Sequence, residues 1–265
     1  MKYEINSLAV YEFGDRKNPS IIFVHGFPFD HTMWKEQINE LQKDHHIVVY
    51  DIRGLGESYV GDGQYTMEAY VSDLFSVMEG MKLNKPVLCG LSMGGYISLR
   101  AVEVGEDKFS GLILLDTKSQ SDDDNGKLVR SNSINKINIE GLASFAESFV
   151  SNLFAEENKE ELIDVYNDTI KMAQSHNPLG VKGALIAMLS RTDTTKNLEK
   201  IMIPTLVMGG AFDKLTPPTV MREMAEKIKD SEYASVPRAG HMAPLENPSF
   251  VNDMIRGFIK RRIVK

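Results

Sequence analysis

The sequence contains a single cysteine, Cys89, among its 265 residues. One thiol cannot form an intramolecular disulfide, and it cannot supply the several thiolates of a cysteine-based zinc cluster. The hydrophobic core alone must therefore stabilise the fold, and a chain of this length is long enough to build one. The lack of a disulfide framework is typical of a reducing compartment, so we expect a cytoplasmic protein.

Long apolar runs are also missing. Charged residues or glycines interrupt every apolar stretch well before the ~18 consecutive residues that a membrane-spanning helix needs. The N-terminal stretch contains Glu4 and Glu12 and lacks the apolar segment of a secretory signal. The sequence therefore predicts no membrane partner.

Positive charge is scarce. The chain has 30 Lys and Arg against 37 Asp and Glu, which gives a formal net charge of -7. Its basic residues are scattered, apart from a short run at 260–262. Nucleic-acid binding requires a basic patch that neutralises phosphates, so we expect no nucleic-acid partner.

The sequence does contain an alternation of strand and helix patterns. Short β-rich apolar runs closed by turn signals predict strands at 21–24, 47–50, 87–89, 112–115, 205–208 and 233–236. Apolar residues spaced three or four apart predict helices at 34–41, 67–78, 96–104, 218–228 and 248–260. This alternation predicts an α/β fold with a doubly wound, mostly parallel sheet.

Residues 117–197 break the alternation, because they contain amphipathic helix patterns and no clear strand. We interpret them as a helical insertion, with residues 1–116 and 198–265 forming the core domain. Phe145 and Phe149 recur at helical spacing in the insertion, so their apolar face must pack against the body, and part of it is a candidate pocket wall. The acidic run at 122–124 is interpreted as a solvated turn or a helix N-terminus.

The segment Gly90-Leu91-Ser92-Met93-Gly94 follows a predicted strand and precedes a predicted helix. A G-x-S-x-G motif in this context forms a tight turn that exposes the serine hydroxyl, and the glycines relieve the crowding of that turn. Ser92 is therefore the candidate nucleophile. A serine hydroxyl is a poor nucleophile at neutral pH and needs a base oriented by a third group.

His241 is the candidate base, because it lies in a loop after the last predicted strand, where an imidazole can reach over the strand ends. Asp213 and Asp116 each follow a predicted strand and are the two candidates for the orienting acid. We favour Asp213, because Gly209 and Gly210 allow its loop to bend toward the histidine. Asp116 is then a structural residue.

Acyl transfer also requires hydrogen-bond donors for the developing oxyanion. The backbone N–H of Met93, at the start of the helix after Ser92, is one candidate. The loop His25-Gly26-Phe27-Pro28 follows another predicted strand, and Gly26 allows it to turn sharply. Because Pro28 has no N–H, Phe27 is the second candidate donor.

These motifs resemble the α/β-hydrolase superfamily, in its branch of small carboxylesterases and enol-lactonases. The segments that carry the resemblance are HGFPFD at 25–30, DIRGLGES at 51–58, GLSMGG at 90–95, GGAFDKLTP at 209–217 and AGHMAPLENP at 239–248. The order Ser92, Asp213, His241 is the order of this superfamily. The resemblance implies that the insertion 117–197 is a helical cap, whereas Asp51 is expected to fix a turn without taking part in the chemistry.

The sequence therefore predicts a cofactor-free hydrolase of carboxylic esters of small to medium size, with no metal. Lactone opening, carbon–carbon bond hydrolysis and a perhydrolase reaction remain open, because the same triad serves all three. A ligand-binding sensor of the same fold is the alternative from another class. Candidate substrate-binding residues are Phe145, Phe149 and Trp34, although a buried Trp on an amphipathic helix is more often part of the core. The small-molecule ester or lactone is the only partner predicted.

Overall fold

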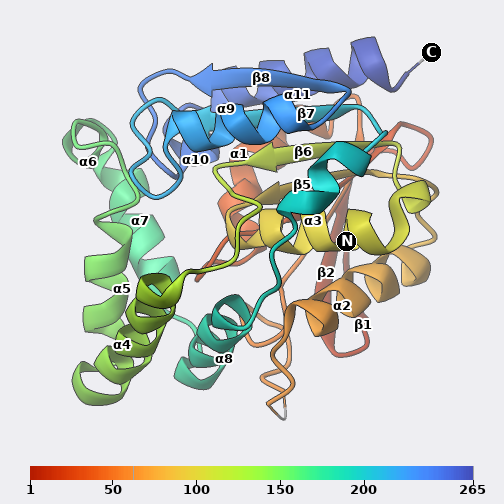
Figure 1. The fold of residues 1–265 in the computed structure, drawn as a ribbon. Coiled ribbons are helices and arrows are strands. Elements are labelled where there is room, and N and C mark those ends of the chain that lie inside the picture. Colours follow the sequence, from red (N-terminus) through yellow and green to blue (C-terminus); the bar gives the residue numbers. More distant parts are fainter. Residues whose placement is uncertain (62, 265) are drawn as a thin grey trace.

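An eight-stranded sheet forms the centre of the computed structural model, which describes residues 1–61 and 63–264. Its strands are β1 (Lys2–Ile5), β2 (Leu8–Phe13), β3 (Ser20–Val24), β4 (His46–Tyr50), β5 (Val87–Leu91), β6 (Gly111–Leu115), β7 (Thr205–Gly210) and β8 (Ser231–Val236). They are ordered β1-β2-β4-β3-β5-β6-β7-β8 (Figure 1). The six strands from β3 to β8 are mutually parallel, and β1 and β2 pair antiparallel at one edge.

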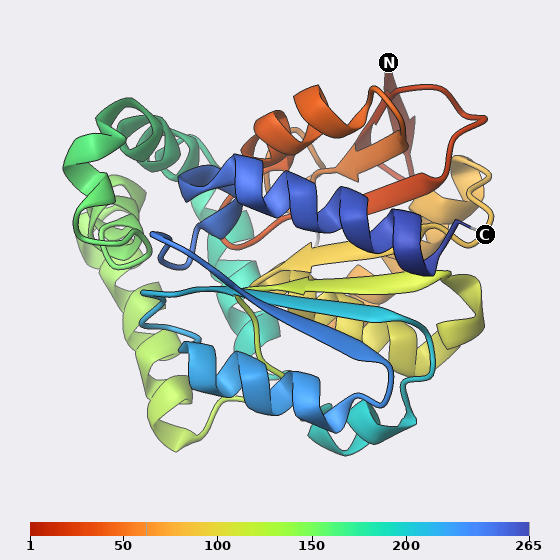
Figure 2. The same cartoon turned by 90° about the horizontal axis from the view of Figure 1, so that it is seen from above.

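Helices cover both faces of the sheet, as Figure 2 shows from above. The helices α2 (Met67–Gly80), α3 (Met93–Gly105) and α9 (Pro218–Lys227) pack on one face, and α1 (Lys35–Leu41) and α11 (Pro248–Arg262) pack on the other. Along β3 the side chains alternate between the two cores: Ile22 joins the first and Phe23 the second. The prediction of a doubly wound, mostly parallel sheet is confirmed.

The strands β1 and β2 were not predicted. They form the antiparallel edge of the sheet, and the side chains of β1 alternate between exposed and partly buried positions. The charge at Glu12 interrupts the apolar pattern of β2, but this carboxylate is buried and paired with Arg16 and His46. An edge strand with polar residues on one face lacks the continuous apolar run of a central strand.

The remaining helices lie between β6 and β7 or in short connections. They are α4 (Asp124–Glu140), α5 (Leu142–Val150), α6 (Asn158–Glu161), α7 (Ile163–Gln174), α8 (Pro178–Leu189), α10 (Ala243–Glu246) and the 3₁₀ helices η1 (His31–Trp34), η2 (Glu106–Lys108) and η3 (Thr195–Lys200). Both views place α4, α5, α6 and α7 beyond the carboxyl ends of the parallel strands (Figures 1 and 2). Among the described residues, every helix is too short or too polar to cross a membrane.

Candidate active site

Four candidate residues follow the carboxyl ends of four neighbouring strands. Ser92 and Asp116 directly follow β5 and β6, Asp213 lies three residues beyond β7, and His241 lies in the loop after β8. The carboxyl ends of parallel strands meet at one edge of the sheet, where α/β proteins bind ligands. The structure brings all four side chains to this edge.

Ser92 occupies a strained turn between β5 and α3, with φ of 52° and ψ of -113°. This positive φ is unusual for a residue with a side chain. A β-carbon on Gly94 would clash with the carbonyl of Val24, and one on Gly90 would clash with the carbonyl of Gly94. Both glycines are therefore needed for the close approach of the backbone around Ser92.

Ser92, His241 and Asp213 form one hydrogen-bonded chain. His241 Nε2 lies 2.9 Å from Ser92 Oγ, and His241 Nδ1 lies 2.8 Å from Asp213 Oδ2. Because a carboxylate only accepts hydrogen bonds, the Nδ1–H group donates to Asp213, and Nε2 is left to accept from the serine hydroxyl. The side chains of His241 and Asp213 are buried. This arrangement can transfer the hydroxyl proton of Ser92 to His241.

The loop after β7 keeps Asp213 ionised. Asp213 Oδ1 accepts hydrogen bonds from the N–H groups of Leu215 and Thr216 at 2.8 and 3.1 Å, and Oδ2 accepts one from the Thr216 hydroxyl. Burial raises the pKa of Asp213, but its electrostatic interaction with His241 and the hydrogen bonds from His241 and Thr216 outweigh burial, so this pKa lies well below its usual range. Asp213 therefore carries its negative charge at neutral pH.

Asp116 is the second carboxyl group near His241, but the two are not hydrogen-bonded to one another among the described residues. Its Oδ1 accepts the N–H of Gly210 at 2.7 Å, whereas its Oδ2 has no partner there. Burial and the negative charge of Asp213 raise the pKa of Asp116 well above its usual range. The buried site and the charged Asp213 therefore favour the protonated form of Asp116.

Buried Glu246 fixes the backbone on both sides of His241. Its two oxygens accept hydrogen bonds from the N–H groups of Gly240, Met242 and Ala155 and from the Asn158 amide, at 2.7 to 3.2 Å. Ala155 and Asn158 belong to the helical segment between β6 and β7. One carboxylate thus ties the histidine loop to that segment.

We expect Glu246→Ala to lower the free energy of unfolding by about 3 kcal/mol or more, because four buried donors lose their acceptor. Urea unfolding at pH 8 measures this loss. Glu226→Ala, at an exposed position of α9, is the control and should change stability by less than about 0.5 kcal/mol. Equal losses in the two variants would contradict the role given to Glu246.

Two backbone N–H groups near Ser92, those of Phe27 and Met93, are candidate donors to an oxyanion. A β-carbon on Gly26 would lie only 3.6 Å from that of Ser92, so the loop containing Phe27 runs close to the serine. Met93 begins α3, where the first N–H groups lack an acceptor within the helix. Within the described residues, the N–H groups of Phe27 and Met93 donate to no other group. Both remain available for an oxyanion.

A cavity of about 440 Å³ opens beside Ser92 and His241. Its other lining residues are Phe27, Tyr96, Lys118, Asp122, Gly126, Val129, Arg130, Phe149, Asn152, Met188, Lys214, Leu215 and Thr216. The cavity therefore combines the hydrogen-bonded chain with apolar walls and with several charged side chains.

Of the candidate pocket residues, only Phe149 lines this cavity. Phe145 is buried and stacks behind it, with ring centroids 5.5 Å apart. Trp34 is fully buried against Phe23 in the core on the far face of the sheet, and the side chain of Met93 is also fully buried. The expectation that Trp34 forms a pocket wall is therefore wrong, because its helix turns that face toward the sheet.

The acidic run at 122–124 is only partly as expected. Asp123 caps α4 by accepting the N–H of Gly126, which makes the run a helix N-terminus. Asp122, however, is buried rather than solvated and pairs with Arg191 at 2.9 Å and Arg130 at 3.1 Å. Burial raises the pKa of Asp122, but the hydrogen bond from Arg191 and the charges of both arginines lower it to about 2.

The family model described as the alpha/beta hydrolase fold matches residues 19–248. The chain belongs to the alpha/beta-hydrolase family. A thermophilic esterase from Thermogutta terrifontis, in a malate-bound structure, is 35% identical with a TM-score of 0.94 and 98% coverage of both chains. The 3-oxoadipate enol-lactonase 1 of Acinetobacter baylyi is 25% identical over 254 residues, which are 96% of this chain and 93% of that protein.

The enol-lactonase structure from Burkholderia xenovorans has a TM-score of 0.90 at 23% identity, covering 98% of this chain and all of the other, and shows a shared fold. The expected membership of the superfamily, in its branch of small esterases and enol-lactonases, is confirmed. These relatives and the family support hydrolase activity for this chain.

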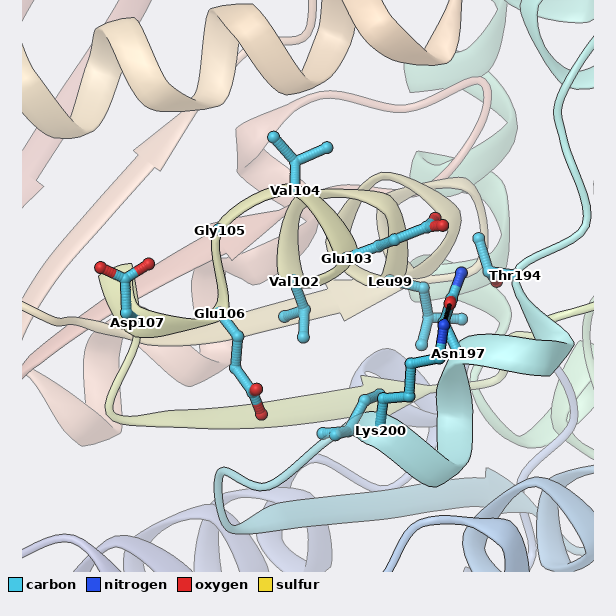
Figure 3. A pocket seen from close by; sticks show the side chains of 11 residues that line it. Leu99, Val102, Glu103, Val104, Gly105, Glu106, Asp107, Thr194, Asn197 and Lys200 are labelled. Carbon is cyan, nitrogen blue, oxygen red and sulfur yellow. Dashed lines mark hydrogen bonds between the residues drawn. The ribbon is translucent and has the colours of Figure 1, made fainter.

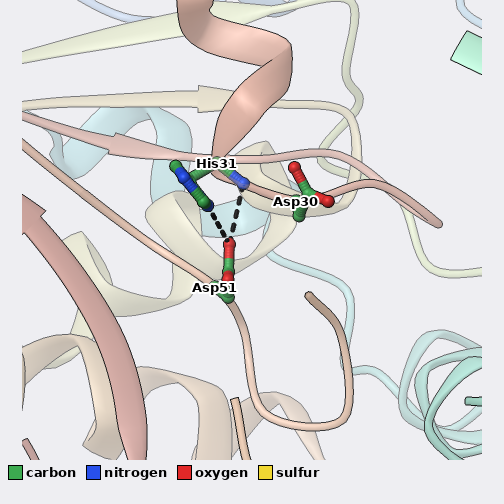
Figure 4. A group of neighbouring side chains, drawn as sticks. All are labelled: Asp30, His31 and Asp51. Carbon is green, nitrogen blue, oxygen red and sulfur yellow. Dashed lines mark hydrogen bonds and ion pairs between the residues drawn. The ribbon is translucent and has the colours of Figure 1, made fainter. Parts of the chain in front are cut away.

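A second cluster of histidine and carboxylate side chains in this alpha/beta hydrolase consists of Asp30, His31 and Asp51 (Figure 4). Its hydrogen bonds fix the backbone of neighbouring loops. Asp51 Oδ1 accepts hydrogen bonds from the backbone N–H and from Nδ1 of His31, and its Oδ2 accepts the N–H of Glu57. Asp30 caps η1 through the N–H of Thr32. These contacts match the turn-fixing role expected of Asp51.

Another cavity, of about 590 Å³, lies between the end of α3 and η3. Figure 3 shows its charged lining side chains, Glu103, Glu106, Asp107 and Lys200. Glu106 Oε1 accepts hydrogen bonds from the N–H groups of Met202 and Ile203, two residues that precede β7. Ser92, His241 and Asp213 are not among the residues that line this cavity.

Sequence reasoning missed several residues of the site. Thr216 and Lys214 lie in the same GGAFDKLTP segment as Asp213, so that segment carried a signal for both. Glu246 lies five residues after His241 in the AGHMAPLENP segment. Lys118 and Arg130 had no such signal, because only folding brings them to the Ser92 cavity.

Proposed function

We propose that this protein hydrolyses carboxylic esters of small to medium apolar substrates through an acyl-enzyme intermediate on Ser92, without a cofactor. The hydrogen-bonded chain from Ser92 through His241 to ionised Asp213 is the observation that carries this proposal. Membership of the alpha/beta-hydrolase family and the 35% identity to an esterase support it further.

In the first half of the reaction, Ser92 Oγ attacks the carbonyl carbon of the ester while its proton moves to His241 Nε2. Asp213 holds the imidazole through Nδ1 and stabilises the imidazolium. The N–H groups of Phe27 and Met93 donate to the oxyanion. The carbon–oxygen bond to the alcohol then breaks, and His241 gives its proton to the leaving oxygen.

In the second half, water replaces the alcohol. His241 takes a proton from the water molecule as its oxygen attacks the acyl carbon, and the same N–H groups stabilise the second oxyanion. The bond to Ser92 breaks, the proton returns to Ser92 Oγ, and the carboxylic acid leaves. The enzyme regains its starting state, and the net reaction consumes one ester and one water.

Lactone opening is the second candidate, because a curated relative that covers 96% of the chain is a 3-oxoadipate enol-lactonase. A lactone is a cyclic ester, so every proton transfer is the same. The difference lies in the product, because the alcohol and the acid remain in one molecule. Product identification by mass spectrometry on matched esters and lactones separates the two activities.

The helical segment 117–197 is proposed to act as a cap over this site. Eight of its residues line the cavity beside Ser92: Lys118, Asp122, Gly126, Val129, Arg130, Phe149, Asn152 and Met188. Substrate selection would then depend on this segment, while the chemistry depends on the loops of the sheet.

The proposal predicts that a fluorophosphonate modifies Ser92 and stops the hydrolysis of 4-nitrophenyl acetate and butyrate. Ser92 Oγ forms a bond to phosphorus, fluoride leaves, and His241 takes the proton. Tryptic mass spectrometry should locate one adduct per chain, on the peptide that contains Ser92. Protein unfolded in guanidinium should gain no adduct, because the base is no longer adjacent. No adduct and no release of 4-nitrophenolate from folded protein would refute the proposed function.

A further inference from the structure

Three cationic side chains converge on the cavity beside Ser92. Lys118 comes from the loop after β6, Arg130 from α4, and Lys214 from the loop after β7. Among the described residues, Asp122 is the only acid that lines the same cavity. This local excess of positive charge occurs in a chain whose formal net charge is -7. The net charge of the cavity wall is therefore positive, whereas the net charge of the whole chain is negative.

Asp122 does not cancel this excess of positive charge, because the carboxylate of Asp122 is already paired with Arg191. Arg191 Nη2 donates to Asp122 Oδ1 at 2.9 Å, and the same guanidinium donates to the carbonyls of Met188 and Gln120. Arg191 is buried and lies over the ring of Tyr96 at 4.1 Å. The buried Asp122–Arg191 pair is thus close to neutral, and the charges of the cavity cations remain.

The cavity cations have donors to spare. Arg130 contacts Asp122 through Nε, and its two terminal nitrogens have no hydrogen-bond partner in the described part of the chain. Lys118 Nζ lies 3.7 Å from Asp122, beyond hydrogen-bond distance. Lys214 makes no hydrogen bond or ion pair with any described residue, yet its loop is fixed by the hydrogen bonds of its neighbours to Asp213.

Partial burial strengthens the charges of Arg130 and Lys118, whereas Lys214 is exposed. The side chain of Arg130 is 18% exposed and that of Lys118 is 29% exposed, so water screens them less than it screens cations on an open surface. The rest of the wall is mostly apolar, with Phe27, Phe149 and Leu215 among its members. A cavity of this kind suits a ligand with a short apolar chain and an anionic end.

We propose that the substrate carries a carboxylate in addition to its reacting ester or lactone carbonyl, and that Arg130, Lys118 and Lys214 bind this carboxylate. This inference rests on the hydrolase function proposed above. Arg130 offers the planar pair of N–H donors that fits a carboxylate, and the two lysines add charge without fixed geometry.

The test uses two esters of the same shape. In mono-4-nitrophenyl glutarate a carboxylate replaces the terminal methyl of 4-nitrophenyl pentanoate, so the pair differs in charge and hardly in size. At pH 8 and low salt, wild-type kcat/KM should be about tenfold or more higher for the glutarate ester. Added sodium chloride should reduce this ratio, because the attraction is Coulombic.

The variants Arg130→Met and Lys214→Met keep an unbranched side chain and remove the charge. Each should lower the glutarate-to-pentanoate ratio of kcat/KM by about three- to tenfold. Lys127→Met is the matched control, because Lys127 lies on α4 but outside the cavity and pairs with exposed Asp124. It should keep the wild-type ratio.

Equilibrium binding separates this inference from the proposed function. An unreactive ketone, 5-oxohexanoate, should bind the wild type more tightly than its neutral counterpart 2-hexanone, and Lys214→Met should reduce this preference by about three- to tenfold, as measured by titration calorimetry. Anion-selective binding without turnover of either ester would refute hydrolysis and leave the anion site standing. A wild type without preference for the anionic ester and the anionic ketone, or variants that keep the preference, would overturn the inference.

Discussion

Replacing Ser92 with alanine is expected to lower kcat for 4-nitrophenyl butyrate by roughly 10⁶-fold. The variant loses the hydroxyl oxygen that lies 2.9 Å from His241 Nε2, so no acyl-enzyme can form on residue 92. In the proposed mechanism, the residual rate comes from water that attacks the bound ester directly, while the N–H groups of Phe27 and Met93 stabilise the oxyanion. Stopped-flow or steady-state release of 4-nitrophenolate measures the change.

Ser98→Ala is the matched control. Ser98 lies in α3, six residues after Ser92, and its hydroxyl is buried and donates to the carbonyl of Gly94. Its loss should reduce stability by about 1 kcal/mol and leave kcat nearly unchanged. If folded Ser92→Ala protein retained the wild-type rate, another group would have to be the nucleophile and the proposed mechanism would be wrong.

The central sheet could be predicted because its strands are buried on both faces. Residues 21–24, 47–50 and 112–115 are continuous apolar runs, and each lies within a strand of the structure. The positions of Ser92 and Asp213 then followed from the topology, since parallel strands present their carboxyl ends at one edge. The edge strands escaped prediction because β1 alternates between exposed and partly buried positions.

The cavity wall could not be predicted, because apolar periodicity identifies a buried face but not what covers it. Phe145 and Phe149 share one helix, yet only Phe149 reaches the cavity. The charged residues of the cavity wall could not be predicted for a related reason. Lys118, Arg130 and Lys214 come from three separate elements and resemble ordinary surface residues in the sequence, so their convergence depends on tertiary structure.

Asp213→Asn is expected to lower kcat by about 10⁴-fold in folded protein. The N–H groups of Leu215 and Thr216 hold Oδ1 at 2.8 and 3.1 Å, so the asparagine oxygen will occupy that position. Its NH₂ group will then face His241 Nδ1, which must give up its proton to accept this hydrogen bond. The proton moves to Nε2, and His241 can no longer accept the proton of Ser92.

Asp116→Asn should behave differently, although Asp116 follows the neighbouring strand. Burial and the charge of Asp213 raise the pKa of Asp116, which favours the neutral form that asparagine resembles. Its amide oxygen can still accept the N–H of Gly210, which lies 2.7 Å from Oδ1. We expect less than about a tenfold loss in kcat, because no proton of His241 is redirected. Thermal unfolding would establish that both variants are folded. A 10⁴-fold loss in Asp116→Asn with a mild effect of Asp213→Asn would assign the orienting acid to Asp116.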